Sequence, residues 1–326
     1  MPPTGSHPGM LVTRQIPEIG LELLSKHFAV EVNKEDRDLS QSELLRRLKG
    51  KFGVVAMLSN KFDARVISGL GELKVISNFA VGYNNVDVKA ATEKGIAVTN
   101  TPGVLTDATA DMTFGLLLAA ARRIAEGDRL VRAGKFKGWT PMMMLGHDVS
   151  GKTIGIVGAG RIGTAVTMRA KGFGMRILYF SHRRNRVMES SGARAASLDR
   201  LLSQSDFISL NVPLTEETRG MIGRREIGLM KPNSILVNTA RGEIVDESAL
   251  IEALKKRKIA GAALDVYTDE PHVRSEFFKL DNVVLAPHLG SATFETRAKM
   301  SELAAMNAIA VLQGEKPQAI VNPEVL

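Results

Sequence analysis

Three glycines, Gly158, Gly160 and Gly163 in "GAGRIG", have a spacing that suggests a specific chemistry. An apolar β-rich run, "TIGIV", precedes them, and "TAVTMRAKGFG", with helical apolar spacing, follows. In a strand–turn–helix unit the first glycine permits the tight turn, the second lets the backbone approach a pyrophosphate, and the third lets helix and strand pack closely. The motif therefore predicts a dinucleotide site, whose phosphate contacts we expect at Gly158, Ala159, Gly160, Arg161, Ile162 and Gly163.

The next strand-like run, "RILYF", ends in Ser181, His182, Arg183 and Arg184. An acidic residue normally stands at this place and bonds the ribose 2′-hydroxyl of NAD. Here a hydroxyl and two guanidiniums can instead hydrogen-bond a 2′-phosphate. The turn therefore predicts that NADP(H) is preferred and NAD(H) remains possible. The weaker interpretation is that these are only solvated basic residues.

Composition limits the classes of function. The 326 residues suggest about two domains, and the absence of cysteine excludes disulfides, thiol nucleophiles and cysteine zinc sites. The net charge of +8 is spread along the chain, and one Trp with three Tyr gives little aromatic surface for stacking on bases. We therefore expect small anionic ligands, no nucleic acid and no metal.

The longest apolar stretch, Phe114–Ala121, is far shorter than the roughly 20 residues of a membrane span. The first residues, Met1–Gly9, have no basic-then-apolar signal layout and read as a frayed tail. These features predict a cytoplasmic protein without a membrane partner.

The first hundred residues alternate strand and helix signals, which predicts a parallel sheet covered by helices. The strand-like runs are Met10–Arg14, Phe28–Val32, Phe52–Leu58, Leu73–Ala80 and Ile96–Asn100, and the helical segments are Glu18–His27, Ser40–Gly50, Asp63–Leu70 and Val86–Gly95.

After "NTPGV" the pattern predicts a long helix from Asp107 to about Gly127 and then a basic, Met-rich segment, Arg129–Asp148, with little periodicity. A second β-α series runs from Lys152 to about Pro287, and a last helix is expected over Ser291–Gly314. The fold class is therefore α/β with two domains.

Three later segments contain an Arg, a Glu and a His: "LVNTARGEIVDESAL", "AALDVYTDEP" and "LAPHLGSAT". Taken singly, these residues would be interpreted as a surface ion pair, part of a solvated turn and a loop residue. With the glycine turn, the three segments resemble the D-isomer-specific 2-hydroxyacid dehydrogenases, from about Phe52 to the C-terminus. Within that family the chain is most similar to the NADP-preferring glyoxylate/hydroxypyruvate reductases and 2-ketogluconate reductases. The resemblance implies a Rossmann-type dinucleotide-binding domain at 101–290. It also implies a discontinuous, flavodoxin-like substrate domain at 1–100 and 291–326.

The resemblance implies three reacting residues, Arg241, Glu270 and His288. The chemistry of 2-oxo acid reduction asks for the same types. A planar guanidinium suits the substrate carboxylate and polarises the neighbouring carbonyl. An imidazole can protonate the carbonyl oxygen near neutral pH, and a carboxylate beside it stabilises the imidazolium and fixes the ring.

Other positions carry over from the family as expected contacts. The backbone N–H groups of Val81 and Gly82 would bind the substrate carboxylate, and Leu58, Ser59 and Ser291 would also face the substrate. The remaining cofactor contacts are expected at Thr109, Val212, Pro213, Thr218, Thr239, Asp265 and Gly290.

Members of the family are usually homodimers joined through the segment that matches residues 107–148. The apolar stretch "GWTPMMMLG" fits burial against such a partner, and Trp139 with the methionines would approach the neighbour's pocket. One alternative keeps the fold but not the reaction: a nucleotide-sensing binding protein.

Overall fold

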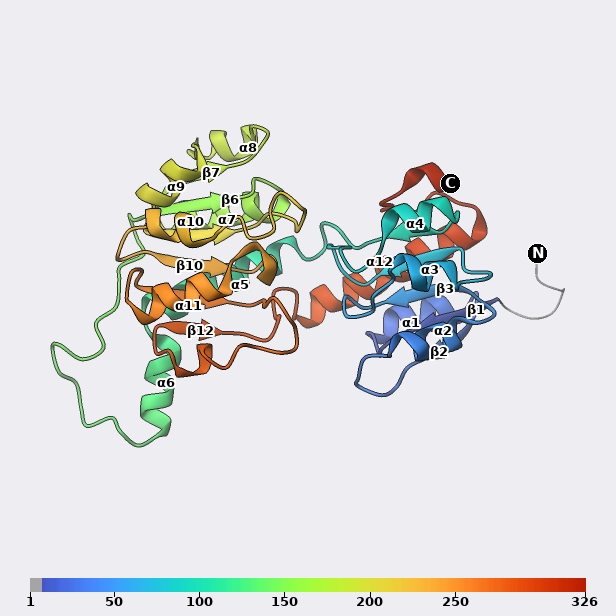
Figure 1. The fold of residues 1–326 in the computed structure, drawn as a ribbon, viewed down its shortest axis with the longest axis horizontal. Helices are drawn as coiled ribbons and strands as arrows, with labels where there is room; N and C mark the ends of the chain where they lie inside the picture. Colours follow the sequence, from blue (N-terminus) through green and yellow to red (C-terminus); the bar gives the residue numbers. More distant parts are fainter. Residues whose placement is uncertain (1–7) are drawn as a thin grey trace. The chain divides into compact units, whose positions relative to one another are not determined.

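The computed structural model describes residues 8–326, which divide into two units (Figure 1). One unit combines the chain up to Leu105 with Thr293–Leu326, and the other is Thr106–Ala292. Each contains a parallel sheet with helices packed on it, so the predicted α/β class is confirmed. Of the expected tail, Met1–Gly9, the residues up to His7 lie outside the described range. Gly9 already begins a strand.

The first unit is built on a five-stranded sheet with the order β2-β1-β3-β4-β5, which is the flavodoxin-like order. Its strands are short, and buried apolar residues such as Val54 and Val55 in consecutive positions show that both faces are covered. The strands are β1 Gly9–Val12, β2 Ala29–Val32, β3 Lys51–Ala56, β4 Val75–Asn78 and β5 Ala97–Thr99.

Helices from both ends of the sequence cover this sheet. The C-terminal helix α12 packs on α1 and on β3 and β4, where Gly20 of α1 leaves no room for a Cβ against Ser301. Helix α12 therefore belongs to the first unit although it follows the second in sequence. The helices are α1 Glu18–Ser25, α2 Gln41–Leu48, α3 Ala64–Ser68, α4 Val88–Glu93 and α12 Phe294–Gln313, with a short 3₁₀ turn at Pro323–Val325.

The second unit has a seven-stranded parallel sheet with the order β12-β11-β10-β9-β6-β7-β8. The chain order reverses between β6 and β9, and ligands of doubly wound sheets bind outside the carboxyl ends of the strands at such a reversal. The strands are β6 Thr153–Val157, β7 Arg176–Phe180, β8 Arg194–Ala195, β9 Phe207–Leu210, β10 Ile235–Asn238, β11 Gly261–Leu264 and β12 Val283–Leu285.

Two apolar cores lie on opposite faces of this sheet. Along β10, Ile235 and Val237 join one core and Leu236 the other, which is the alternation that a strand imposes. Helices α5 and α7 cover one face, and α9, α10 and α11 the other. The helices are α5 Thr106–Ala121, α6 Ile124–Arg132, α7 Arg161–Gly172, α8 Arg186–Ser190, α9 Leu198–Gln204, α10 Arg224–Leu229 and α11 Glu247–Lys255, with 3₁₀ turns at Gly242–Ile244 and Phe277–Lys279.

The expectation of one continuous helix over Asp107–Gly127 is wrong. Helix α5 ends at Ala121, and α6 begins after Arg123, whose φ of 54° is left-handed. The carbonyl of Ala121 accepts the N–H of His147 at 2.8 Å, so a segment returning from later in the chain caps α5. The Arg123 guanidinium bonds the Glu126 carboxylate at 2.8 and 2.9 Å and stabilises the break.

Among residues 8–326, no helix is both long and apolar enough to cross a membrane. In the same range no three His, Cys, Asp or Glu side chains gather closely enough to hold a metal ion.

Candidate functional site

The glycine turn joins β6 to α7 and has the shape that its sequence predicts. Gly158 has a φ of 103°, and a Cβ there would lie 2.7 Å from the carbonyl carbon of Asn211. A Cβ on Gly163 would collide with the Gly158 carbonyl oxygen, so only glycine allows this helix to pack so closely. A Cβ on Gly160 would meet nothing within 4 Å. The open space over Gly160 is where a pyrophosphate can approach the backbone.

No side chain caps the start of α7, so its first N–H groups are available as donors. The partial positive charge of a helix N-terminus favours an anion at this position. The loop after β9 lies beside the turn, because the Gly158 Cβ position is 2.8 Å from the amide nitrogen of Val212. The Thr218 hydroxyl donates to the Pro213 carbonyl at 2.6 Å and fixes this loop.

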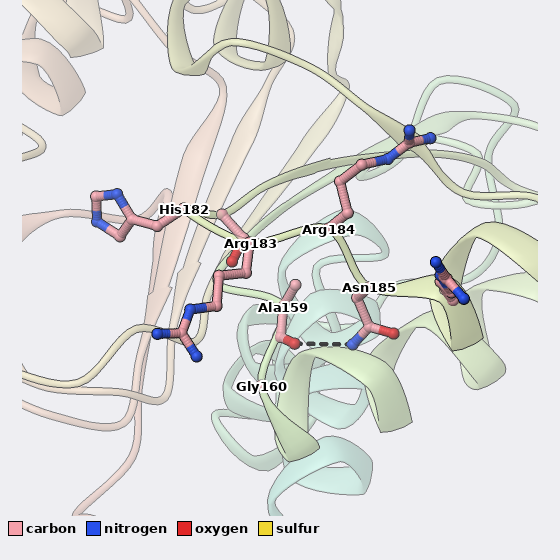
Figure 2. A pocket seen from close by; sticks show the side chains of 8 residues that line it. Ala159, Gly160, His182, Arg183, Arg184 and Asn185 are labelled. Atoms are coloured by element: carbon pink, nitrogen blue, oxygen red, sulfur yellow. Dashed lines mark hydrogen bonds between the residues drawn. The ribbon is translucent and has the colours of Figure 1, made fainter.

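An open pocket of about 480 Å³ lies beside the glycine turn (Figure 2). None of the side chains that line it carries a carboxylate, and three carry a guanidinium. The lining of the pocket is therefore basic and can hydrogen-bond an anionic group. The lining residues are Ala159, Gly160, Ser181, His182, Arg183, Arg184, Asn185 and Arg186.

The basic residues of this pocket are not equivalent. Figure 2 shows Arg183 and Arg184 extending in opposite directions. Arg184 Nε donates to Glu189 Oε1 at 2.9 Å, and the Tyr179 hydroxyl donates to the same oxygen at 2.7 Å. These two donors lower the pKa of Glu189. The Arg184 guanidinium is therefore engaged in an ion pair with Glu189.

Arg183 makes no hydrogen bond or ion pair with any residue in the described range 8–326, whereas His182 lies 3.5 Å from the Glu217 carboxylate. Both His182 and Glu217 are about four-fifths exposed, at 79 and 78%. Among the basic residues predicted to face the 2′-phosphate, Arg183 thus has the guanidinium that is most available to a ligand.

Sequence reasoning missed Asn185 and Arg186 as pocket residues. Asn185 accepts the N–H groups of Val187 and Met188 as the N-cap of α8. An asparagine directly before a short helical pattern was the available signal. Nothing in the sequence shows that its amide also reaches the glycine turn.

Arg241, Glu270 and His288 lie after β10, β11 and β12, which are adjacent in the sheet. His288 Nδ1 and Glu270 Oε2 are 2.7 Å apart, with 33 and 35% of the side chains exposed. The Tyr267 N–H donates to the other Glu270 oxygen at 3.0 Å. Burial raises the pKa of Glu270. Hydrogen bonds from His288 and Tyr267 and the charge of Arg241 lower the pKa by more than burial raises it, so the net shift is downward. The carboxylate is therefore charged beside the imidazole.

Arg241 is held by the loop that follows β10. The Asn238 side chain accepts the Ala240 N–H at 3.0 Å and donates to the Arg241 carbonyl at 2.8 Å. Gly242 packs on the Tyr267 backbone too tightly for a Cβ. Burial lowers the pKa of Arg241, and the charges of Glu270 and Glu243 partly offset this. A guanidinium stays protonated in proteins, so the loop presents a largely desolvated cation.

Asp265 organises the loop that carries His288. Its two carboxylate oxygens accept the N–H groups of Leu289 and Gly290, both at 2.7 Å, and its carbonyl accepts the His288 N–H at 2.9 Å. Burial raises the pKa of Asp265 in spite of these bonds. His288 is left-handed, with a φ of 56°, a strained conformation that this loop maintains.

Thr109 and Thr239, which are also predicted to contact the cofactor, lie close to the loop that carries His288. The Gly290 Cβ position is 3.5 Å from Thr109 Cγ2, and the hydroxyls of Thr113 and Thr239 are 2.8 Å apart. Ser291 is also buried here.

Leu58, Ser59, Val81 and Gly82 lie in the first unit, in loops that follow β3 and β4. The N–H groups of Val81 and Gly82 have no hydrogen-bond acceptor among residues 8–326. Sequence reasoning missed the amides that shape these loops. Asn78 Nδ2 donates to the Gly82 carbonyl at 2.6 Å, and Asn85 Nδ2 donates to the Met57 and Asn60 carbonyls at 3.3 and 3.2 Å, joining the two loops.

Comparison with known proteins identifies the family of the chain. The family described as D-isomer specific 2-hydroxyacid dehydrogenase, NAD binding domain, matches residues 114–290. A glyoxylate reductase of Thermococcus litoralis is 52% identical over 324 residues, which cover 98% of each chain.

Two solved structures are also similar. The glyoxylate reductase from Paecilomyes thermophila has a TM-score of 0.87 and 36% identity and covers 99% of both chains. An NADPH-dependent glyoxylate/hydroxypyruvate reductase from Sinorhizobium meliloti, in complex with NADP and malonate, has a TM-score of 0.88 and 32% identity and covers 98% of both. The chain belongs to the D-isomer specific 2-hydroxyacid dehydrogenase family.

Proposed function

We propose that the protein reduces a small 2-oxo acid, glyoxylate or hydroxypyruvate, to the 2-hydroxy acid with NADPH. The observation that carries this proposal is the meeting of Arg241 with the Glu270–His288 pair at the ends of three adjacent strands. The names of the Thermococcus and Sinorhizobium relatives support the same substrates. A 2-ketogluconate reductase is the second candidate.

Each residue of this group has a distinct role. Arg241 binds the substrate carboxylate and polarises the neighbouring carbonyl with its planar fork of donors. His288 donates a proton to the carbonyl oxygen as negative charge develops there. Glu270 fixes the ring through Nδ1, which leaves Nε2 as the proton-donating atom. Bound NADPH supplies the hydride.

In the first unit, Val81 and Gly82 remain predicted contacts of the same substrate carboxylate. The N–H groups of Val81 and Gly82 suit a carboxylate, because backbone donors bind an anion without adding a flexible side chain. The Asn78 and Asn85 amides hold their loop in a fixed shape, so little conformational entropy is lost when the carboxylate binds.

The preference for NADPH is assigned mainly to Arg183. Its guanidinium has no partner among the described residues, whereas Arg184 is paired with Glu189. Ser181 supplies a hydroxyl in the same pocket. We expect kcat/KM for NADPH to exceed that for NADH with the best 2-oxo acid. The measurement is cofactor oxidation with glyoxylate, hydroxypyruvate and 2-ketogluconate, each tested with both cofactors.

Two arginine variants make this test specific. Arg183→Ala is expected to lower kcat/KM for NADPH about 10- to 100-fold, the effect of losing one charge-assisted contact, and to leave NADH nearly unchanged. Arg184→Ala, which removes an equal charge, should change NADPH use much less. A higher kcat/KM with wild type and NADH would contradict the preference. Binding of NADPH without turnover of any 2-oxo acid would favour a nucleotide-sensing protein.

We also propose a homodimer formed through about residues 107–148. This segment exposes large apolar side chains: Phe136 is 51% exposed, Trp139 78%, Met142 76% and Leu145 58%. Surfaces of this kind mark interaction sites. Light scattering at micromolar concentration should give twice the monomer mass, and Met142→Asp should shift that mass toward the monomer. A monomeric wild type would overturn the proposal.

A further inference from the structure

Asn185 joins the basic turn to the glycine turn, and both ends of its amide are used. Nδ2 donates to the Ala159 carbonyl at 2.8 Å and to Thr164 Oγ1 at 2.9 Å. Oδ1 accepts the N–H groups of Val187 and Met188 at 3.0 and 3.1 Å. Figure 2 shows the amide reaching from the end of the basic turn to Ala159. One side chain therefore links three segments: the glycine turn, the start of α7 and the start of α8.

The backbone of Asn185 is held as well. Its N–H donates to the Tyr179 hydroxyl at 3.2 Å, and that hydroxyl donates to Glu189. Asn185 is half-buried, whereas His182, Arg183 and Arg184 are exposed. Arg184 is tied to Glu189, but Arg183 has no hydrogen-bond partner among residues 8–326, so its position depends on the backbone that Asn185 holds in place.

The hydrogen bonds of Asn185 affect the affinity for the cofactor through conformational entropy. An exposed basic turn loses freedom when it binds a phosphate, and that loss subtracts from the binding energy. A turn already fixed at the correct distance from the pyrophosphate loses less. The benefit applies to a cofactor that touches both turns, because the bond to Ala159 sets the spacing between them.

We propose that Asn185 is a positioning residue for cofactor discrimination: it sets the basic turn of residues 181–184 against the glycine turn, and so favours a dinucleotide that carries a 2′-phosphate. This inference rests on the proposed function, in which that turn takes the 2′-phosphate. Asn185 itself is not assigned a contact with the phosphate.

Asn185→Ser is the informative variant. Serine is also a good N-cap residue and retains an acceptor for α8, but it lacks the amide that reaches Ala159 and Thr164. We expect the Kd of NADPH, measured by fluorescence titration of the whole protein, to rise about tenfold, as for the loss of one or two net hydrogen bonds. The Kd of NADH should change less than about threefold. The ratio of the two constants is the readout, and thermal unfolding checks that the variant is folded.

Thr164→Val is the matched control, because it removes one of the two acceptors of the amide and leaves the bond to Ala159. Its effect on the ratio should be smaller, and it should add nothing further in the Asn185→Ser background. If Asn185→Ser weakens both cofactors equally, or neither, the inference is overturned while the proposed function stands. If the wild type binds NADH more tightly, the proposed function fails and the inference falls with it.

Discussion

Replacing His288 with glutamine is expected to lower kcat for 2-oxo acid reduction by about 10²- to 10⁴-fold, the usual contribution of a general acid. Glutamine keeps a hydrogen-bonding side chain of similar reach but cannot transfer a proton near neutral pH. The Kd of NADPH should stay within about twofold, because no predicted phosphate contact involves this residue. Steady-state oxidation of NADPH and a binding titration measure the two quantities.

Glu270→Gln is the companion variant. It keeps a side chain that can bond Nδ1 of His288 but removes the negative charge 2.7 Å from the ring. Without that charge the imidazolium is less well stabilised and oriented, so kcat for 2-oxo acid reduction should fall. The loss at the pH optimum should be smaller than for His288→Gln. A wild-type rate in His288→Gln with every acid tested would remove His288 from the reaction.

Arg241→Ala is expected to lower kcat/KM for the 2-oxo acid by about 10³-fold, the equivalent of about 4 kcal/mol. Two charge-assisted hydrogen bonds of a bidentate guanidinium–carboxylate pair account for a loss of this size. Since the Asn238 amide donates to the backbone carbonyl of residue 241, a bond that alanine keeps, the fold of the loop should survive. Initial rates across a range of acid concentrations give the constant.

Arg241→Lys separates charge from geometry. Lysine keeps the positive charge but not the planar fork, so it should recover only part of the activity lost in Arg241→Ala. Recovery to the wild-type rate would mean that charge alone is needed. An alanine variant with wild-type kcat/KM would exclude Arg241 as the anchor of the carboxylate.

The fold was predictable where local pattern and tertiary structure agree. The Gly158–Gly163 turn is an example. A Cβ on Gly158 would collide with the loop after β9, and a Cβ on Gly163 would collide with the turn itself, so the packing requires glycine at both positions. The strand and helix alternation of the first unit follows from the same agreement between periodicity and burial.

The break between α5 and α6 could not be predicted, because the helical apolar pattern runs through it. What ends α5 is the N–H of His147 on the Ala121 carbonyl, a contact from a residue far along the chain. Such tertiary contacts override the helix propensity of the residues, and they cannot be inferred from a single sequence.

The candidate site shows the same limit. Residue types alone placed Arg183 and Arg184 together, and only the contact of Arg184 with Glu189 separates them. The reach of the Asn185 amide to Ala159 likewise depends on how two turns pack. In the first unit, Asn78 falls within a predicted strand, and the sequence alone does not show that the Asn85 amide joins two loops.

The first unit is formed by two separate stretches of the chain, and this has a consequence for folding during translation. The Ser77 hydroxyl bonds the Ala304 carbonyl at 2.8 Å, and the Val98 N–H bonds the Asn322 side chain at 2.7 Å. A ribosome releases β4 and β5 long before α12, so one side of their sheet waits uncovered while Thr106–Ala292, a continuous stretch, is translated and able to fold. The segment made first is thus the last to be completed, and nascent chains stalled before α12 are the ones that chaperones should retain.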